Sequence, residues 1–279
     1  MKKGIVLVVS LIAFQAFSQM FNYGHKDLAF KNLLDNGICY LQTGDSLFDH
    51  KMLDALDKYW KISDYTTVEK YERPPKETTA LFVTTKEPTK KYMMDRKNQH
   101  VLVLQPAKLY KKDKQVPFDQ TLGYMYYNGF HEMLAEDEEH LFNRYIIQAL
   151  NKGLSLIKEK QLHNSNETLN EQIAEEITQQ SKGQMGNTLI LNREFLVHFI
   201  DEDKLKKYDI TYRLFAKELF FEALKTSNRT HYLLYYSVNT KTDLSLINLV
   251  TGELLYVKHF PEGYTELEPK ELKIIADYF

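Results

Sequence analysis

Residues 231–259 read HYLLYYSVNTKTDLSLINLVTGELLYVKH, and this stretch predicts three consecutive strands. The first strand is expected at 231–238, and the other two, at 244–249 and 254–259, flank a Val-Thr-Gly-Glu turn. Runs of apolar, aromatic and β-branched residues bounded by turn residues are typical of strands. Gly252 can adopt the positive φ that a tight hairpin turn requires. The stretch therefore predicts an antiparallel end to a sheet and disfavours an all-parallel, doubly wound fold.

The order of elements around this stretch recurs in the first half of the chain. The phrase KYWKISDYTTVEKYE at 58–72 occupies the position that KKYDITYRLFAKELF at 206–220 occupies in the second half. Both phrases contain Lys-Tyr, continue into β-rich residues and reach a charged helix start. These patterns indicate either an internal duplication of a unit of about 75 residues or a coincidence, because alternation of strands and helices is common.

The periodicity predicts an α/β fold with two related mixed-sheet α/β units, which a helical segment joins. In the first half we expect strands at 38–42, 61–68, 79–85, 100–105 and 123–129, and a helix at 49–60. In the second half we expect further strands at 188–192 and 209–215, and helices at 202–208 and 216–225. The expected divisions are a signal peptide at 1–18, a first α/β unit at 19–135, a long helix and polar connector at 136–186, and a second α/β unit with a C-terminal helix at 187–279.

The N-terminus has the three regions of a secretory signal peptide in their usual order. Lys2 and Lys3 are followed by an apolar run at 4–14, which is shorter than the roughly 20 residues of a spanning helix. Ala16 and Ser18 then supply the small side chains that precede a cleavage site. The alternative is a buried N-terminal strand or helix. We expect export, to the periplasm or the cell exterior, and a soluble protein rather than an integral membrane protein.

Composition narrows the range of functions. The chain has 279 residues, 43% of them hydrophobic, and a formal net charge of −2, which argues against a nucleic-acid binder. Cys39 is the only cysteine, so no internal disulfide is possible. Its apolar surroundings favour a buried structural thiol over a catalytic nucleophile.

Motifs that would indicate an enzyme or a bound cofactor are missing from the sequence. The chain has no G-x-S-x-G nucleophile elbow, no glycine-rich phosphate loop and no H-x-x-x-H or H-x-H metal pair. We therefore expect no cofactor, and a non-catalytic binding or interaction role in the cell envelope rather than an enzymatic one. Its partner would be an envelope protein, a glycan or an anionic ligand.

Two groups of residues are candidates for ligand binding. The segment 86–114 holds nine basic residues against three acidic ones, and such a surface can meet an anionic partner. The alternative is a lysine-rich hairpin that keeps an edge strand soluble. Three nearby tyrosines could form an aromatic platform, or they could pack in the core. The candidate residues are Lys90, Lys91, Lys111, Lys112, Tyr124, Tyr126 and Tyr127.

A possible metal site lies in the densest cluster of imidazoles and carboxylates. Its candidate ligands are His131, Glu136 and His140. Such side chains can hold a divalent ion, and the alternative function is then an exported hydrolase that uses carboxylates or this metal. The other interpretation is a solvated acidic helix start, because negative charges stabilise the first turn of a helix.

Three stretches carry a resemblance to a known group of proteins. They are the signal-like end AFS-Q at 16–19, KYWKISDY at 58–65 and INLVTGELLY at 247–256. Together they resemble uncharacterised secreted proteins of Bacteroidota. The resemblance implies an exported α/β protein, and it implies no activity and no catalytic residues.

Overall fold

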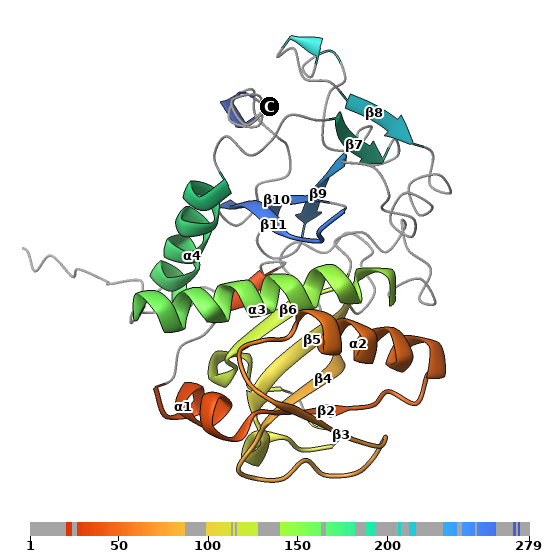
Figure 1. The fold of residues 1–279 in the computed structure, drawn as a ribbon, viewed down its shortest axis with the longest axis vertical. Helices are drawn as coiled ribbons and strands as arrows, with labels where there is room; N and C mark the ends of the chain where they lie inside the picture. Colours follow the sequence, from red (N-terminus) through yellow and green to blue (C-terminus); the bar gives the residue numbers. More distant parts are fainter. Residues whose placement is uncertain are drawn as a thin grey trace, which may run out of the picture.

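The fold is mixed α/β and contains two separate sheets, as Figure 1 shows. The structure is a computed structural model. It describes residues 21–23, 27–86, 99–112, 114, 116–127, 140–162, 166–181, 188–192, 203, 206–207, 212–215, 231–238, 242–248, 250–260, 270–271 and 273.

The first sheet has six strands in the order β1-β6-β5-β4-β2-β3. Its strands are β1 (Phe21–Tyr23), β2 (Ile38–Leu41), β3 (Tyr65–Val68), β4 (Thr79–Lys86), β5 (Gln99–Pro106) and β6 (Gly123–Tyr126). β2 pairs in parallel with both β3 and β4, whereas β4–β5, β5–β6 and β6–β1 are antiparallel. The connections after β2 and β3 therefore begin at the same edge of the sheet.

The second sheet has five strands in the order β11-β10-β9-β7-β8. Its strands are β7 (Thr188–Asn192), β8 (Tyr212–Phe215), β9 (His231–Val238), β10 (Thr242–Asn248) and β11 (Leu254–Phe260). β7 pairs in parallel with β8 and β9, and β9–β10 and β10–β11 are antiparallel. The order and directions of β7 to β11 thus match those of β2 to β6, strand for strand.

The helices are α1 (Asp27–Asn36), α2 (Ser46–Tyr59), α3 (Asn143–Lys160) and α4 (Asn166–Ser181). α2 begins three residues before the expected position because the Asp45 side chain accepts hydrogen bonds from the backbone N–H groups of Leu47 and Phe48. α2 and α3 pack against each other, and α4 packs against β11 (Figure 1). In the sequence, α3 and α4 lie between the two sheets.

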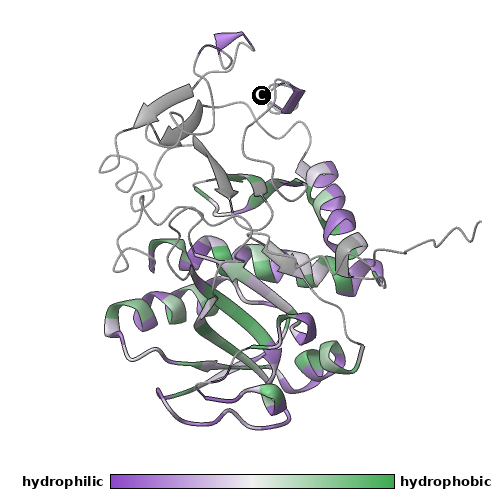
Figure 2. Ribbon diagram, turned by 180° about the vertical axis from the view of Figure 1, so that it is seen from behind, coloured by the Kyte–Doolittle hydropathy of each residue, from purple (hydrophilic) through white to green (hydrophobic). Residues whose placement is uncertain are grey.

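The two faces of the first sheet are buried in different ways. Alternation along the strands points Leu81, Leu102 and Leu104 into the core that the helices share. The opposite face presents Phe82 and Val103, and residues of the connection between β5 and β6 pack against it. Figure 2 shows that the middle strands of this sheet are predominantly hydrophobic. One face is therefore covered by α-helices and the other by the connection between β5 and β6, which contains the short 3-10 helices Ala107–Leu109 and Phe118–Gln120.

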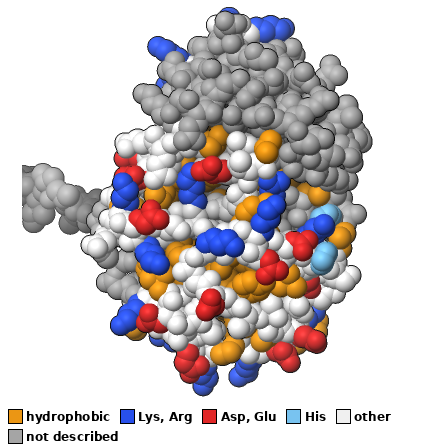
Figure 3. Space-filling model, viewed as in Figure 1, with side chains coloured by type: hydrophobic (Ala, Val, Ile, Leu, Met, Phe, Trp, Pro, Cys, Tyr) orange, Lys and Arg blue, Asp and Glu red, His pale blue; other side chains and the backbone are white. Residues whose placement is uncertain are grey.

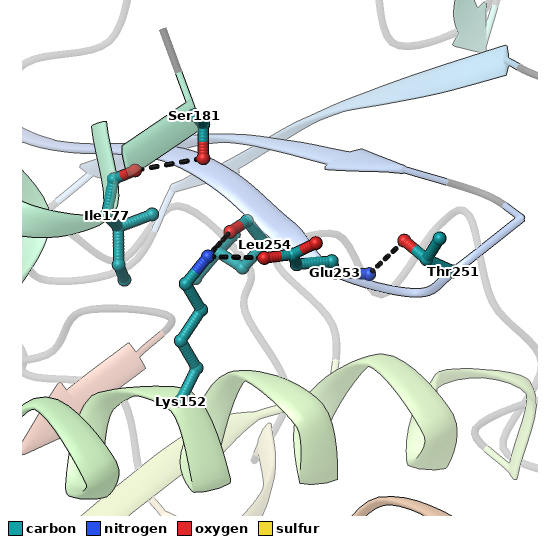
Figure 4. Close-up of polar contacts among 6 residues, drawn as sticks. All are labelled: Lys152, Ile177, Ser181, Thr251, Glu253 and Leu254. Atoms are coloured by element: carbon teal, nitrogen blue, oxygen red, sulfur yellow. Dashed lines mark hydrogen bonds and ion pairs between the residues drawn. The ribbon is translucent and has the colours of Figure 1, made fainter. Parts of the chain in front are cut away.

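Helix α3 contacts the turn between β10 and β11 through residues one helical turn apart. Arg144 Nη2 donates to the Val250 carbonyl oxygen, and Gln148 Nε2 donates to that of Thr251 at 2.8 Å. Lys152 Nζ then lies 2.7 Å from Glu253 Oε1 and 3.1 Å from the Leu254 carbonyl oxygen (Figure 4). The spacing i, i+4, i+8 places these three side chains on one face of α3.

Strand bounds in the second half follow the sequence closely. β7 and β9 have the expected limits, and Gly252 has φ +76° in the expected hairpin turn. β8 is shorter than the stretch expected at 209–215. Residues 216–225, where a helix was expected, lie outside the described residues.

Residues 1–18, the predicted signal peptide, also lie outside the described residues. In the part of the chain that the structure describes, no helix combines the length and apolar character that crossing a bilayer requires.

Candidate binding surface

The connection from β2 to α2 is fixed by one buried carboxylate. Asp49 Oδ1 accepts hydrogen bonds from Tyr40 Oη at 2.6 Å, from the Thr43 backbone N–H at 2.8 Å and from Thr43 Oγ1 at 3.0 Å. Its Oδ2 accepts a hydrogen bond from the Gly44 backbone N–H at 2.9 Å. Because four donors occupy this carboxylate, its role is to hold the connection in place.

Tyr40 and Cys39, the titratable residues of β2 beside this connection, are not activated as nucleophiles. Burial, together with the hydrogen bond to Asp49, raises the pKa of the Tyr40 hydroxyl. Burial likewise raises the pKa of the Cys39 thiol, which confirms the expected buried cysteine. Both groups stay protonated at neutral pH, and the thiol is shielded from solvent.

Lys70 lies against the fixed connection. Gly44 has φ +85°, and a Cβ on it would stand 2.7 Å from Lys70 Cδ and 3.4 Å from Lys70 Nζ. A side chain at position 44 would therefore occupy the space of the lysine. The absence of a side chain at Gly44 lets the Lys70 ammonium group approach the backbone at the carboxyl end of β2.

Tyr71 is the centre of a small cationic and aromatic cluster. Its side chain is 66% exposed, and its φ of +80° is a left-handed conformation that is rare and strained for a bulky residue. Lys112 Nζ lies 4.0 Å from the centroid of its ring, and Lys70 Nζ lies 5.4 Å away. Both distances are typical of cation–π contacts. We call Lys70, Tyr71 and Lys112 the Tyr71 surface.

Two separate segments build the Tyr71 surface. Lys70 and Tyr71 stand in the turn that follows β3, where the Glu69 backbone N–H donates to Glu72 Oε2 at 3.1 Å and the Glu72 N–H donates to the Glu69 carbonyl oxygen at 3.0 Å. Lys112 comes from the connection between β5 and β6. Glu72 thus closes the turn, and Lys70 and Lys112 reach the Tyr71 ring from two different connections.

Charged side chains of both signs cover the helical side of the molecule. Figure 3 shows that, among the described residues, Lys, Arg, Asp and Glu are interspersed on the face that α2 and α3 cover. Mixed charges of this kind are ordinary for a soluble surface. Two ammonium groups around one exposed ring form a more specific arrangement, which can bind a carboxylate, phosphate or sulfate group.

The predicted basic residues divide between described and undescribed segments. Lys111 and Lys112 are exposed, and Lys112 belongs to the Tyr71 surface. Lys90 and Lys91 lie outside the described residues.

The three predicted platform tyrosines are buried, which corrects their assignment as an exposed aromatic platform. Tyr124 and Tyr126 are each 2% exposed and Tyr127 is fully buried. Tyr124 packs edge-on against Phe118 and Tyr126, with ring centroids 5.0 and 5.9 Å apart. Tyr124 and Tyr126 alternate along β6 and pack in the core on one face of the sheet. Tyr127, directly after β6, packs in the core on the other face.

The predicted metal site is only partly visible. His140 stands half-buried at the start of the turn that precedes α3, while His131 and Glu136 lie outside the described residues. Among the residues that the structure does describe, no group of three or more His, Cys, Asp or Glu side chains could hold a metal ion. The metal site and the hydrolase therefore remain predictions from the sequence.

Lys70 and Tyr71 were not identified as binding residues from the sequence. They occur in the phrase KYWKISDYTTVEKYE, where the pattern pointed to a possible repeat. The sequence contains one signal for this position: a tyrosine stands between charged residues, after a strand and before Pro74-Pro75. Its contact with Lys112 joins positions 41 residues apart, which local spacing cannot reveal.

Searches with the chain against protein-family models, curated proteins and solved structures find no match.

Proposed function

We propose that this chain is an exported, non-catalytic binding protein of the cell envelope that recognises an anionic group through the Tyr71 surface. The observation that carries the proposal is the exposed Tyr71 ring with two lysine ammonium groups within 5.4 Å of its centroid. An aromatic face beside two cations offers contact area and charge together. The ligand would carry carboxylate, phosphate or sulfate groups.

The backbone of Tyr71 supports a functional role for this position. A left-handed conformation costs a residue other than glycine roughly 1–2 kcal/mol. Such strain is concentrated at ligand-binding positions, where it is retained because it presents a side chain. Tyr71 buries little of its ring, so core packing offers small compensation.

Export is part of the proposal and rests on the sequence at 1–18. When the full chain is produced in a Gram-negative host, mass spectrometry of the exported protein should place its N-terminus at Gln19. Replacing the small residues Ala16 and Ser18 by Leu should block processing. An exported protein that retains residues 1–18 would contradict the signal peptide.

We propose that the two sheets belong to two related α/β units. The shared order and directions of β2 to β6 and β7 to β11 support descent from one duplicated α/β unit. The same support comes from the phrases at 58–72 and 206–220, which contain the equivalent strands β3 and β8. In this proposal the helical segment of α3 and α4 joins the two units.

Calorimetric titration with three simple anions tests the binding function. The probes are hexaglutamate, a heparin-derived hexasaccharide and tripolyphosphate, which represent carboxylate, sulfate and phosphate. The double variant Lys70→Glu, Lys112→Glu should weaken binding of the preferred probe at least tenfold. Its matched control is Lys31→Glu, Lys158→Glu, which changes the net charge equally at exposed sites on α1 and α3.

Three outcomes decide the proposal. A loss confined to the Lys70, Lys112 variant supports the Tyr71 surface. An equal loss in the control variant would mean that only net charge attracts the probe, and no binding of any probe to the natural chain would overturn the anionic-ligand function.

A second variant separates binding from folding. Asn adopts the left-handed conformation more readily than Tyr, so Tyr71→Asn should leave the protein equally stable or more stable by up to about 1 kcal/mol. The same variant should weaken probe binding because the ring is lost. A stability loss without a binding loss would assign Tyr71 a structural role instead.

A further inference from the structure

The Tyr71 surface continues directly from an open edge of the first sheet. β3 is the last strand in the order β1-β6-β5-β4-β2-β3, and β2 is its only strand partner among the described residues. Thr66 and Thr67, in the middle of β3, are both exposed. An edge of this kind can accept a further strand from another chain.

The hydrogen bonds between β2 and β3 show which backbone groups of β3 face outward. The Ile38 N–H donates to the Asp64 carbonyl oxygen and the Gln42 N–H donates to that of Val68, both at 3.0 Å. In a parallel pair, alternate residues use their backbone groups toward the partner strand. Residues 64, 66 and 68 therefore bond β2, and the N–H and C=O groups of Tyr65 and Thr67 point to the open side.

The sequence of β3 does not block this edge. Its residues, Tyr-Thr-Thr-Val, include no charge and no proline. Lysine, proline and bulges are the usual devices that keep an edge strand from pairing. In this chain Lys70 comes two residues after β3 ends, and Pro74 and Pro75 follow later still. Among the described residues, the shortness of the strand is the protective feature of this edge.

The charge of the neighbouring lysines favours one kind of segment beside β3. A strand advances about 3.3 Å per residue, so a segment paired with Thr67 passes Lys70 about three residues, or 10 Å, further along. Lys70 and Lys112 hold their ammonium groups around the Tyr71 ring in the turn that directly follows β3. Acidic side chains at that end of the segment would complement the two lysines.

We propose that the Tyr71 surface and β3 together bind an acidic peptide segment in extended conformation, which adds to the first sheet beside β3. This inference rests on the proposed function, because it names the partner class of the same surface. Backbone hydrogen bonds to Tyr65 and Thr67 provide the pairing, and carboxylates held by Lys70 and Lys112 set the register.

The test uses a synthetic peptide of sequence TVTVEEEE with blocked ends, and tripolyphosphate as an anion without a peptide backbone. Thr67→Pro removes the outward N–H, and proline is tolerated on an edge strand when its missing N–H faces solvent. Thr67→Ala is the matched control, because it keeps the N–H while it changes the side chain.

The expected results differ between the two parts of the surface. Thr67→Pro should weaken peptide binding at least tenfold and leave tripolyphosphate binding unchanged, and Thr67→Ala should change neither. Lys70→Glu, Lys112→Glu should weaken both. If Thr67→Pro binds the peptide as well as Thr67→Ala does, the edge pairing is wrong while the anionic site stands. If the variant Lys70→Glu, Lys112→Glu also binds the peptide and tripolyphosphate as tightly as the natural chain does, the proposed function is wrong too.

Hydrogen exchange on the natural chain provides a measurement that does not depend on folding of the proline variant. Saturating peptide should slow exchange of the Tyr65 and Thr67 amides, whereas tripolyphosphate should not. Unchanged exchange at both amides with peptide bound would overturn the edge pairing.

Discussion

The Tyr23 ring occupies the space that a side chain on Gly153 would fill. A Cβ built on Gly153 would overlap the ring carbons of Tyr23, and the Tyr23 hydroxyl donates to the Ala149 carbonyl oxygen at 2.6 Å. Both residues are buried where β1 meets α3. A glycine within a helix costs stability by itself, and this contact explains its presence here.

Gly153→Ala should therefore destabilise the protein despite the better helix propensity of alanine. Overpacking costs about 1–3 kcal/mol, and the gain in propensity is about 1 kcal/mol, so we expect a net loss of up to about 2 kcal/mol in urea unfolding. In a Tyr23→Val background the ring is absent. The same substitution should then raise stability by about 1 kcal/mol, and no change of sign would contradict the contact.

Asn170 attaches β1 to α4. Its Oδ1 accepts from the Tyr23 N–H at 2.8 Å, and its Nδ2 donates to the Tyr23 carbonyl oxygen at 2.9 Å. Asn170→Ala leaves both buried backbone groups without these partners, which should cost about 2–3 kcal/mol. Hydrogen exchange should accelerate at 21–23 and at the paired residues of β6. Gln179→Ala, at an exposed position on the same helix, is the control and should change neither quantity.

The sequence predicted most strands because their signals are local. The apolar runs at 188–192 and 231–238 contain their own strand pattern, and the structure has the same limits. α2 begins before the expected position because Asp45 caps its first turn, and a cap is independent of the apolar spacing that predicts the helix. Gly252 was predicted correctly because a turn between two strands leaves few alternatives to a positive φ.

The candidate site was harder to predict because burial and long-range contacts decide it. Tyr124 and Tyr126 have the same side chains whether they line a ligand platform or a core, and only packing of Phe118 over the sheet settles the matter. The contact between Tyr71 and Lys112 depends on how two connections, one after β3 and one after β5, meet in space. No periodic pattern encodes such an arrangement.

Buried tyrosines should make stability fall at alkaline pH. The pKa of Tyr145 is raised to about 12, mainly by burial, and burial also raises the pKa values of Tyr23 and Tyr40. Below pH about 10 these groups are protonated in both the folded and the unfolded chain, so their contribution to stability is complete. Above pH 10 the unfolded chain loses protons first, and each such tyrosine lowers stability by about 1.4 kcal/mol per pH unit up to its folded pKa.

Tyr40→Phe tests this dependence at one residue. The variant should lose about 1 kcal/mol at neutral pH, because Asp49 loses its 2.6 Å hydrogen bond and keeps three others. Its stability should then fall less steeply than that of the natural chain between pH 10 and 11.5. Urea unfolding across this range provides the comparison, and equal slopes would refute the contribution of Tyr40.

The turn between β10 and β11 depends on glycine at position 252 for two separable reasons. Gly252 has φ +76°, and a Cβ there would overlap Gln148 Nε2 and stand 2.8 Å from Arg144 Nε. Conformational strain costs alanine roughly 1–2 kcal/mol, and crowding against α3 adds about 1–3 kcal/mol. Gly252→Ala should therefore lower the free energy of unfolding by about 2–5 kcal/mol.

Repeating Gly252→Ala in a Gln148→Ala background separates the two causes. Removal of the glutamine amide relieves most of the crowding, while the backbone strain at position 252 is unchanged. The loss caused by Gly252→Ala should then shrink by at least about 1 kcal/mol, as a double-mutant cycle measures. If Gly252→Ala lowers the free energy of unfolding equally in both backgrounds, backbone strain alone explains the need for glycine, and crowding by α3 does not contribute.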